Sequence, residues 1–210
     1  MRSPCCLFPI RIFIIVIILK LKMKLAEYLK SEVQLPDDSI NYFEGLWNYE
    51  ESPKGHQLLR TGSRSRKVFY VEEGLLRLFY NKDGKDITHQ FFSEGDLYVP
   101  IENIFLNQPF PFCLELLENC IVRAVDFSFI ENELEKDVKF LSFSRNLAVS
   151  AIKKLSDQIH SLRFQSAQER YDILLKKHSN ILLRAPLGHI ASYLGITQST
   201  LSVIRSDKAK

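Results

Sequence analysis

The sequence predicts an α+β protein in which a small antiparallel β-domain is followed by a long helix and then by two short helices. Three observations predict this order. Glycines 74, 84 and 95 separate short β-rich segments, apolar residues recur every seven positions from Val138, and Gly195-Ile196-Thr197 separates two short helical patterns. Regular short strands with glycine turns are typical of a small barrel or sandwich. A sustained heptad repeat predicts an extended helix.

The composition is that of a soluble globular protein. The chain has 210 residues, which is ample for a hydrophobic core and fits one or two small domains. Apolar residues make up 46% and charged residues 25%. The net charge of +3 permits nucleic-acid binding without requiring it, so the location of the charges matters more than their sum.

The first 22 residues differ from the rest of the chain. Residues 12–19 read IFIIVIIL, but a membrane span needs about 20 apolar residues. Lysines at 20, 22 and 24 stand where a signal peptide would have small residues and a cleavage site. We therefore expect residues 1–22 to be a dubious extension and translation to start at Met23. A membrane anchor and a poorly ordered tail are the alternatives.

Residues 23–135 form the first predicted domain. Residues 24–47 have a helical pattern that Pro36 divides in two. The β-rich segments follow, and residues 100–112 (PIENIFLNQPFPF) predict a loop or short helix over the barrel. Glu72 and Glu73 are expected to be solvated turn residues rather than paired catalytic carboxylates. The predicted strands are residues 68–71, 75–80, 87–92, 113–117 and 120–125.

Residues 136–164 predict one long helix with an apolar seam over four heptads. Such a seam either packs on the chain's own β-domain or pairs with a second copy in a coiled coil. A helix of roughly 25 residues is about 37 Å long, which exceeds what a small barrel can cover. We therefore expect a homodimer. The seam residues are Val138, Leu141, Arg145, Ala148, Ile152, Leu155, Ile159 and Leu162, with Arg145 as the one interruption.

Residues 165–210 form the last predicted domain. Ser166 and Glu169 have the spacing of a capping box at the start of a helix. Residues 180–184 have strand character and could pair as a tiny hairpin. Gly195 then supplies a left-handed helix end, and Thr197 is placed to cap the next helix. This is the pattern of a helix-turn-helix, whose second helix lies in the major groove of DNA.

Polar residues remain on the outer face of that second helix. Gln198, Ser199 and Ser202 are candidates for base contacts, and Thr200 and Arg205 for phosphate or base-edge contacts, with Thr197 at the helix start. The alternative is a structural helical hairpin whose polar residues are merely solvated. Nearby cations favour DNA, because phosphate neutralisation supplies most non-specific affinity. These cations are Arg163, Arg170, Lys176, Lys177, Arg184, Arg205, Lys208 and Lys210.

The order of these parts resembles that of the CRP/FNR family of bacterial transcription regulators. The strongest segments are residues 68–96 (VFYVEEGLLRLFYNKDGKDITHQFFSEGD) and 186–205 (PLGHIASYLGITQSTLSVIR). The resemblance implies a sensor of cyclic-nucleotide-binding type, an antiparallel β-roll (double-stranded β-helix or jelly-roll type), over residues 23–135. It implies a dimerisation helix at 136–164 and a winged helix-turn-helix at 165–210. It also implies a cytoplasmic homodimer that binds a palindromic promoter site in double-stranded DNA, with RNA polymerase as a candidate partner and no membrane.

The resemblance places an effector pocket in the sensor, but its phosphate cassette is degenerate. Members that bind cyclic AMP carry a Gly-Glu pair after a Gly-Asp turn and, further on, an Arg followed by Ser or Thr. Here Gly95-Asp96 keeps the turn, but Val99-Pro100 and Phe110-Pro111 replace the other two elements. A buried phosphodiester without a cation is costly. We expect no cyclic AMP and an uncharged or hydrophobic effector, or none.

Other cofactors and enzymatic activity lack the residues that they need. Cys113 and Cys120 lack the four-thiolate grouping of an iron–sulfur site, and with Cys5 and Cys6 they are expected to be reduced thiols. His56, His89 and His160 stand alone, which does not favour haem or a metal. No nucleophile elbow, phosphate-binding glycine loop or zinc-protease motif occurs, so we expect no enzyme and no catalytic residue.

One residue favours a second hypothesis, in which the chain is an effector-binding or protein-interaction module that no longer reads DNA specifically. Val203 occupies a position where the family often has a basic residue that contacts guanine. A valine side chain cannot donate a hydrogen bond. A third and weaker hypothesis is a regulator tethered to a membrane by residues 7–19.

Overall fold

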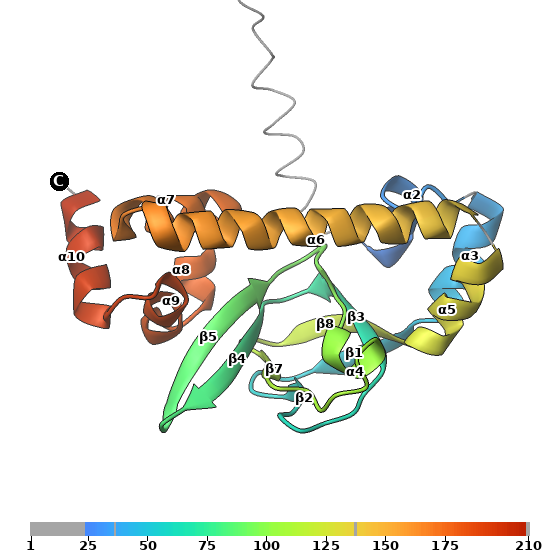
Figure 1. Ribbon diagram of the computed structural model, residues 1–210, viewed down its shortest axis with the longest axis horizontal. Coiled ribbons are helices and arrows are strands. Elements are labelled where there is room, and N and C mark those ends of the chain that lie inside the picture. The colour runs from blue at the N-terminus through green and yellow to red at the C-terminus, as the bar shows by residue number, and fades with distance from the viewer. Residues whose placement is uncertain (1–23, 36, 137, 209–210) are drawn as a thin grey trace, which may run out of the picture.

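The structure, a computed structural model, describes residues 24–35, 37–136 and 138–208. The expectations for residues 1–22 and for a start at Met23 lie outside these residues. A long helix, α6 (Val138–Phe164), lies across the β-sheets (Figure 1). Within the described residues, no helix combines the length and the apolar character that a membrane span requires.

In the part of the chain that the structure describes, eight strands form two four-stranded antiparallel sheets, with the orders β1-β8-β3-β6 and β2-β7-β4-β5. We call residues 48–126 the β-domain. All five predicted strands are confirmed, as β3, β4, β5, β7 and β8. The sheets do not close into a barrel. The strands are β1 (Asn48–Ser52), β2 (Gln57–Leu59), β3 (Lys67–Glu73), β4 (Leu76–Lys82), β5 (Lys85–Phe92), β6 (Leu97–Tyr98), β7 (Cys113–Leu116) and β8 (Cys120–Asp126).

Glycines 74, 84 and 95, the marker glycines that separate the β-rich segments, stand where the backbone needs a positive φ. Gly84 (φ 76°) turns β4 into β5, and Gly95 (φ 83°) lies in the turn before β6. Gly74 (φ 113°) is constrained twice, because a Cβ there would collide with the side chain of Cys120. Both sides of β3 are buried: Phe69 and Val71 face the other sheet, whereas Val68 and Tyr70 pack in clusters with residues of the helices. Side chains of both sheets therefore share one core, which includes Phe69, Val122, Leu78 and Leu114.

Within the described residues, two helices precede the β-domain and pack together against it. They are α2 (Leu25–Ser31) and α3 (Asp37–Gly45), and their apolar side chains bury Tyr70 of β3. The break predicted at Pro36 is confirmed, since the second helix begins at Asp37. The short helix expected within residues 100–112 is also present, as α4 (Ile101–Ile104).

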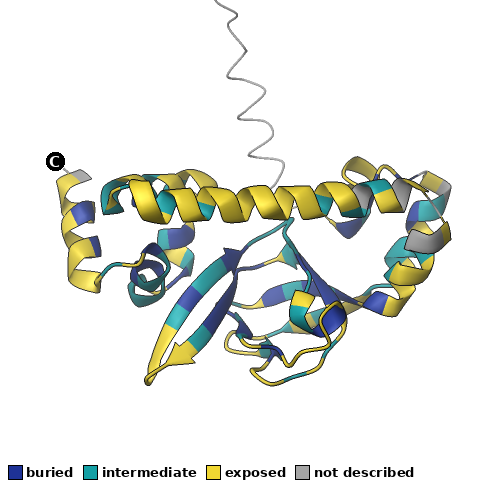
Figure 2. Ribbon diagram, in the orientation of Figure 1, coloured by how far each residue is buried: buried dark blue, intermediate teal, exposed yellow. Residues whose placement is uncertain are grey.

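The long helix follows α5 (Phe127–Lys136) and has 27 residues. Its predicted seam lies in solvent in the single chain. Ile152 is 67% exposed and Ile159 is 56% exposed, and Val138, Leu141, Leu155 and Leu162 are similarly open. Arg145 and Ala148 are exposed as well. Figure 2 shows this exposure along almost the whole of α6. The chain's own β-domain therefore does not bury the seam, although Leu141, Arg145, Ala148, Leu155 and Leu162 line the space between α6 and that domain.

Four helices end the described chain, and we call residues 167–208 the C-terminal helical unit. The capping box at the start of α7 is confirmed, because Ser166 and Glu169 exchange hydrogen bonds with each other's backbone N–H groups. The helices are α7 (Ala167–Lys177), α8 (Ile181–Arg184), α9 (Leu187–Leu194) and α10 (Gln198–Lys208).

The hairpin predicted over residues 180–184 is wrong, because these residues form α8. A short apolar run does not distinguish strand from helix by its own pattern. Here tertiary packing decides, since Ile181 enters the core of the C-terminal helical unit while Leu183 points into solvent. No strand occurs in the described residues 165–208, so the strands that a wing requires are absent there.

Candidate functional site

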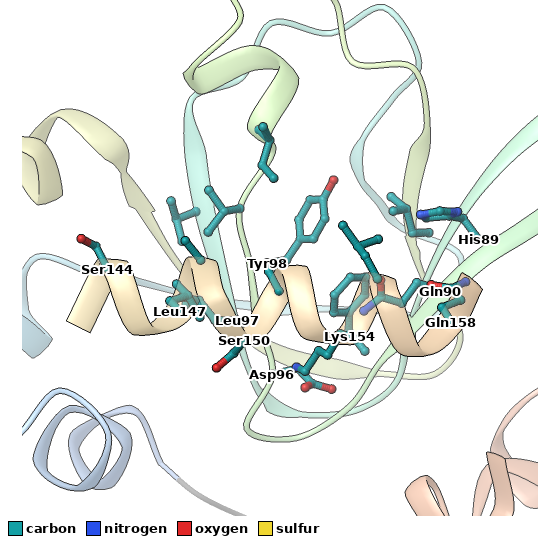
Figure 3. Close-up of a pocket in the computed structure, with 18 of the residues that line it drawn as sticks. His89, Gln90, Asp96, Leu97, Tyr98, Ser144, Leu147, Ser150, Lys154 and Gln158 are labelled. Carbon is teal, nitrogen blue, oxygen red and sulfur yellow. The ribbon is translucent and has the colours of Figure 1, made fainter. Parts of the chain in front are cut away.

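A cavity of about 1270 Å³ lies between α6 and the β-domain. Its two walls come from distant parts of the chain, as Figure 3 shows. The β-domain contributes His89 and Gln90 of β5 and the segment from Asp96 to Tyr98. The facing residues on α6 include Ser144, Leu147, Ser150, Lys154 and Gln158.

The β-domain wall of the cavity is largely apolar and aromatic. Leu78, Phe92 and Tyr98 line it together with Phe112. Burial, with a smaller contribution from Glu102, raises the pKa of Tyr98, so its hydroxyl stays protonated. The His89 ring stacks on Phe112 with centroids 5.1 Å apart. Burial lowers the pKa of His89 despite the opposing effect of Glu102, so this imidazole is neutral at pH 7.

Among the described lining residues, the β-domain wall carries acidic side chains and no Lys or Arg, whereas α6 carries both signs, because Asp157 lines the cavity as well. Asp96 and Glu102 are the acidic residues on the β-domain side, and the Asp96 carboxylate already accepts the N–H of Ser93 at 2.9 Å. The described cations that line the cavity are Arg145 and Lys154 of α6 and Arg170 and Lys177 of α7. An anion held against the β-domain would therefore face two carboxylates.

The arginine that the β-domain does bury is committed elsewhere. Arg77 is 2% exposed and forms ion pairs with Glu115 at 2.6 Å and Asp86 at 3.2 Å. Its guanidinium also lies 3.9 Å from the ring centroid of Phe79. Because Arg77 is not among the described lining residues, this cation is not offered to the cavity.

Of the six residues predicted for the effector pocket, some line the cavity and others lie elsewhere. Asp96 and Val99 line the cavity. Gly95 forms the preceding turn, and Pro100 is buried at the start of α4. Phe110 is fully buried in the core between the sheets, and Pro111 is exposed. The sequence did not predict the α6 side of the cavity, because the heptad pattern of this helix predicts a dimer contact only.

Apart from the cavity, the β-domain has an interface with the C-terminal helical unit. Arg184 of α8 bonds to both Glu94 oxygens, at 2.7 and 3.1 Å, and to Glu118, with a shortest distance of 2.5 Å. Burial alone would lower the pKa of Arg184, but the hydrogen bonds to Glu118 and Glu94 outweigh it and hold the pKa above its usual value. This cation therefore clamps α8 to two turns of the β-domain.

The interface between the β-domain and the C-terminal helical unit is tightly packed around Arg184. Leu75, Phe91 and Leu117 of the β-domain share one buried cluster with residues of α7, α9 and α10. The ring of Phe91 lies 5.3 Å from that of Tyr193. The Ser192 hydroxyl accepts the N–H of Thr88 at 2.9 Å. The two units are thus held by apolar burial and by specific polar contacts.

The pair α9–α10 has the turn that the sequence predicts. Gly195 is left-handed (φ 68°) and ends α9. Thr197 caps α10, since its Oγ1 accepts the N–H of Thr200 at 3.1 Å. Leu201 and Ile204 are buried, which leaves the opposite side of α10 in solvent. All six predicted contact residues are exposed: Thr197, Gln198, Ser199, Thr200, Ser202 and Arg205.

Three side chains expected to be free have partners within the chain. Arg184 is held by the carboxylates described above, and Arg170 donates to the backbone oxygens of Gln165 and Leu194. Glu72 is not a solvated turn residue, because it accepts the N–H of Leu25 at 3.1 Å and pairs with Arg123. The cations available to a phosphate backbone are correspondingly fewer than the sequence suggests.

The thiols in the β-domain are buried and unreactive. Burial raises the pKa of Cys113 and of Cys120 to about 11, so both are protonated at pH 7. The two belong to different strands, β7 and β8. Among the described residues, no group of His, Cys, Asp or Glu side chains converges as metal ligands would.

Comparison with known proteins supports this architecture. Residues 49–137 match the family described as cyclic nucleotide-binding domain. The sequence matches none of the curated proteins. Among solved structures, FixK2 from Bradyrhizobium japonicum is similar with a TM-score of 0.67 and 20% identity, over 77% of this chain and 83% of that chain.

Two further structures show the same fold. A CooA mutant from Carboxydothermus hydrogenoformans matches with a TM-score of 0.60 and 20% identity, over 84% of this chain and 86% of that one. A transcriptional regulator of the crp/fnr family from Eubacterium rectale matches with a TM-score of 0.64 and 13% identity, over 84% and 85%. The chain therefore shares the fold of these solved structures, and its residues 49–137 are similar to the cyclic nucleotide-binding domain family.

Proposed function

We propose that this protein is a homodimeric, cytoplasmic transcription regulator of the CRP/FNR type that binds DNA and responds to a signal other than cyclic AMP. The observation that carries the proposal is the pair α9–α10, with its left-handed Gly195, its Thr197 cap and its solvent-facing α10. This is the arrangement of a helix-turn-helix, in which the second helix enters the major groove.

The outer side of α10 has the chemistry for that role. Gln198 can pair with adenine through two hydrogen bonds, and Ser199 and Ser202 offer short hydroxyls to base edges. Thr200 and Arg205 are proposed to contact phosphates. Thr197 is proposed mainly as the cap, because its hydroxyl is already engaged with Ser199 and Thr200 at 2.8 and 2.9 Å.

The exposed seam of α6 supports the homodimer. Apolar side chains at heptad spacing over 27 residues, about 40 Å of helix, are unfavourable in water unless a second helix covers them. A second copy presents the same stripe and would bury it in a parallel pair. The two α10 helices would then read half-sites about 34 Å apart in a palindromic site.

The cavity supports a signal that is uncharged and at least partly apolar. Its β-domain wall is aromatic, and its charges there, Asp96 and Glu102, are negative. A cyclic phosphate on that wall would lack a cation and would be repelled. Because α6 forms the opposite wall, a ligand that fills the cavity would shift α6 relative to the β-domain and so reposition both α10 helices.

The DNA-binding proposal is tested by selecting duplexes from a random pool with the purified full-length protein and measuring affinity by electrophoretic shift. We expect enrichment of a palindrome and a steep fall of affinity with salt. Gln198→Ala should lower specific affinity at least tenfold with the dimer intact. Gln108→Ala, an exposed glutamine in the β-domain, is the matched control. Unchanged affinity and specificity in Gln198→Ala would count against the proposal.

The signal proposal needs a separate measurement. Adding 1 mM cyclic AMP should leave the melting temperature unchanged, because a ligand that does not bind the folded state cannot stabilise it. Mass spectrometry of small molecules that co-purify with the native dimer should then identify an uncharged, apolar compound. A cyclic-AMP-dependent rise in melting temperature would contradict this part of the proposal alone.

The rival function, an interaction module that does not read DNA, is favoured by one observation: Val203 is exposed at the centre of the outer face of α10. The rival predicts weak DNA binding without sequence preference. A specific-to-nonspecific affinity ratio near one in the selection experiment would support it, whereas a ratio of about 10³ or more would reject it.

A further inference from the structure

The outward face of α10 is made of three serines around one valine. Ser199, Ser202, Val203 and Ser206 follow the spacing i, i+3, i+4, i+7, which places them on one side of a helix. All four are exposed. Leu201 and Ile204, on the other side, are buried in the core of the C-terminal helical unit. Val203 is therefore an apolar side chain on the face that points away from the protein.

Val203 is a branched aliphatic residue that is largely open to solvent. It is 59% exposed, whereas Ile204 beside it is 8% exposed. The serine side chains around it are too short to shield it. β-branched residues are also not favoured by an isolated helix, because they lose side-chain freedom there. Neither packing within the chain nor helix propensity explains a valine at this position.

Two of the three serines are already hydrogen-bonded within the helix. The Ser199 hydroxyl is 2.8 Å from that of Thr197 at the cap. The Ser206 hydroxyl donates to the carbonyl oxygen of Val203 at 2.8 Å. A surface that meets this face therefore encounters a small apolar centre, flanked by two hydroxyls that already have a partner within the chain and by the hydroxyl of Ser202.

The major groove of DNA offers one feature that matches such a centre. Thymine carries a methyl group at C5, and the bases adenine, guanine and unmodified cytosine present no methyl there. Small serines beside Val203 permit close approach of the helix. We infer that Val203 determines sequence specificity by packing against the C5 methyl of a thymine in each half-site. This inference rests on the proposed DNA-binding function, and it replaces the guanine contact that a basic residue would make.

The experiment uses the duplex selected by the full-length protein and replaces each thymine in one half-site, one at a time, with deoxyuridine. Deoxyuridine keeps every hydrogen-bonding group and removes only the methyl. Burial of one methyl group contributes enough to change affinity about fourfold. We expect a loss of that size at one thymine with the wild-type protein, and no further loss at that thymine with Val203→Ala.

Controls separate this contact from a general defect. Ser206→Ala alters the same face one turn later and should keep the fourfold sensitivity to deoxyuridine. Val203→Ala should retain the helical circular dichroism of the wild type, because the side chain is exposed. Val203→Ala should bind the unmodified duplex about fourfold more weakly than the wild type does. Together with the deoxyuridine substitution, this measurement completes a double-mutant cycle between the valine and the thymine methyl group.

Three results would overturn the inference. Equal sensitivity of wild type and Val203→Ala at every thymine would show that another residue reads the methyl, although DNA binding itself would stand. A change in self-association of Val203→Ala without a change in thymine sensitivity would assign Val203 to a protein interface. Failure of the selection to enrich any sequence would remove the proposed function and this inference with it.

Discussion

The β-domain meets the rest of the chain on two sides, and the two sides are built differently. Towards the C-terminal helical unit the contact is closed, with Leu75, Phe91 and Leu117 buried and Arg184 bonded to two carboxylates. Towards α6 there is instead a cavity of about 1270 Å³. Under the proposed function, the C-terminal helical unit would move together with the β-domain, and α6 would be the element whose position a bound molecule changes.

The largest expected effect is on dimer stability and comes from a substitution in α6, the helix on the open side of the β-domain. A carboxylate at the centre of the seam, Ile152→Glu, would be buried against its symmetry mate in the proposed dimer, which is strongly unfavourable. We expect the dimer dissociation constant to rise at least about 100-fold, as measured by sedimentation equilibrium. The closed side should be unaffected, so the β-domain and the C-terminal helical unit should still unfold together.

Asn146→Glu is the matched control for this change, because Asn146 is exposed on α6 outside the seam. It should leave the dimer intact. Equal dissociation of the two variants would mean that general charge on α6, and not the seam, governs association.

The interface between the β-domain and the C-terminal helical unit is weakened most directly by replacing Arg184. Arg184→Met would leave Glu94 and Glu118 close together without their shared cation. Removing one partner of a largely buried ion pair costs several kcal/mol, and the partial exposure of this one reduces the figure to about 2 kcal/mol. Urea unfolding measures the free energy of unfolding. Arg66→Met, which breaks the exposed pair with Glu131, should cost less than about 1 kcal/mol.

Acid should weaken the closed side through His178, which follows α7 and whose Nδ1 lies 3.3 Å from the hydroxyl of Ser93 in the β-domain. Burial, with smaller contributions from neighbouring charges, lowers the pKa of His178 from 6.5 to about 4. Between these pH values the unfolded chain binds the proton and the folded chain does not, so the free energy of unfolding falls as the pH decreases. From pH 7 to 5.5 the loss is about 1 kcal/mol, and above pH 7 the effect vanishes.

The variant His178→Gln isolates that contribution from the titration of carboxylates. Urea unfolding at several pH values should show a smaller decrease from pH 7 to 5.5 in His178→Gln than in the wild type. Parallel pH profiles would mean that His178 does not titrate between the folded and unfolded states.

The smallest expected effect concerns one hydrogen bond of the closed side. Ser192→Ala removes the acceptor of the Thr88 N–H, which then remains without its partner at the edge of β5. The cost is about 1 kcal/mol or slightly less. Amide hydrogen exchange at Thr88 should also become faster. Ser179→Ala, at an exposed serine of the same unit, should change neither quantity.

Local patterns in the sequence predict much of this fold. Each β-strand between the marker glycines, the long helix and the Gly195 turn follow from periodicity and from turn and cap chemistry, which act over a few residues. The exposed positions of Gln198 and Ser202 also follow from helical spacing around Leu201 and Ile204.

Contacts between distant residues could not be predicted in this way. The sequence groups Arg184 with the free cations, yet its partners Glu94 and Glu118 stand 90 and 66 positions away. The pattern of residues 180–184 predicts a hairpin because it lacks the information that Ile181 is buried. The family resemblance places Phe110 in the effector pocket, but this residue fills the core between the sheets. None of these outcomes has a local signal.

The shared buried cluster also has a consequence for how the chain folds during synthesis. Leu75, Phe91 and Leu117 are translated long before Ile190, Leu201 and Ile204, with which they form one core. A nascent β-domain therefore displays an uncovered apolar face until the last helices leave the ribosome. Such a face is prone to aggregation and is a natural binding site for chaperones. A chain truncated before α9 would keep that face exposed permanently, even though every strand of the β-domain is present.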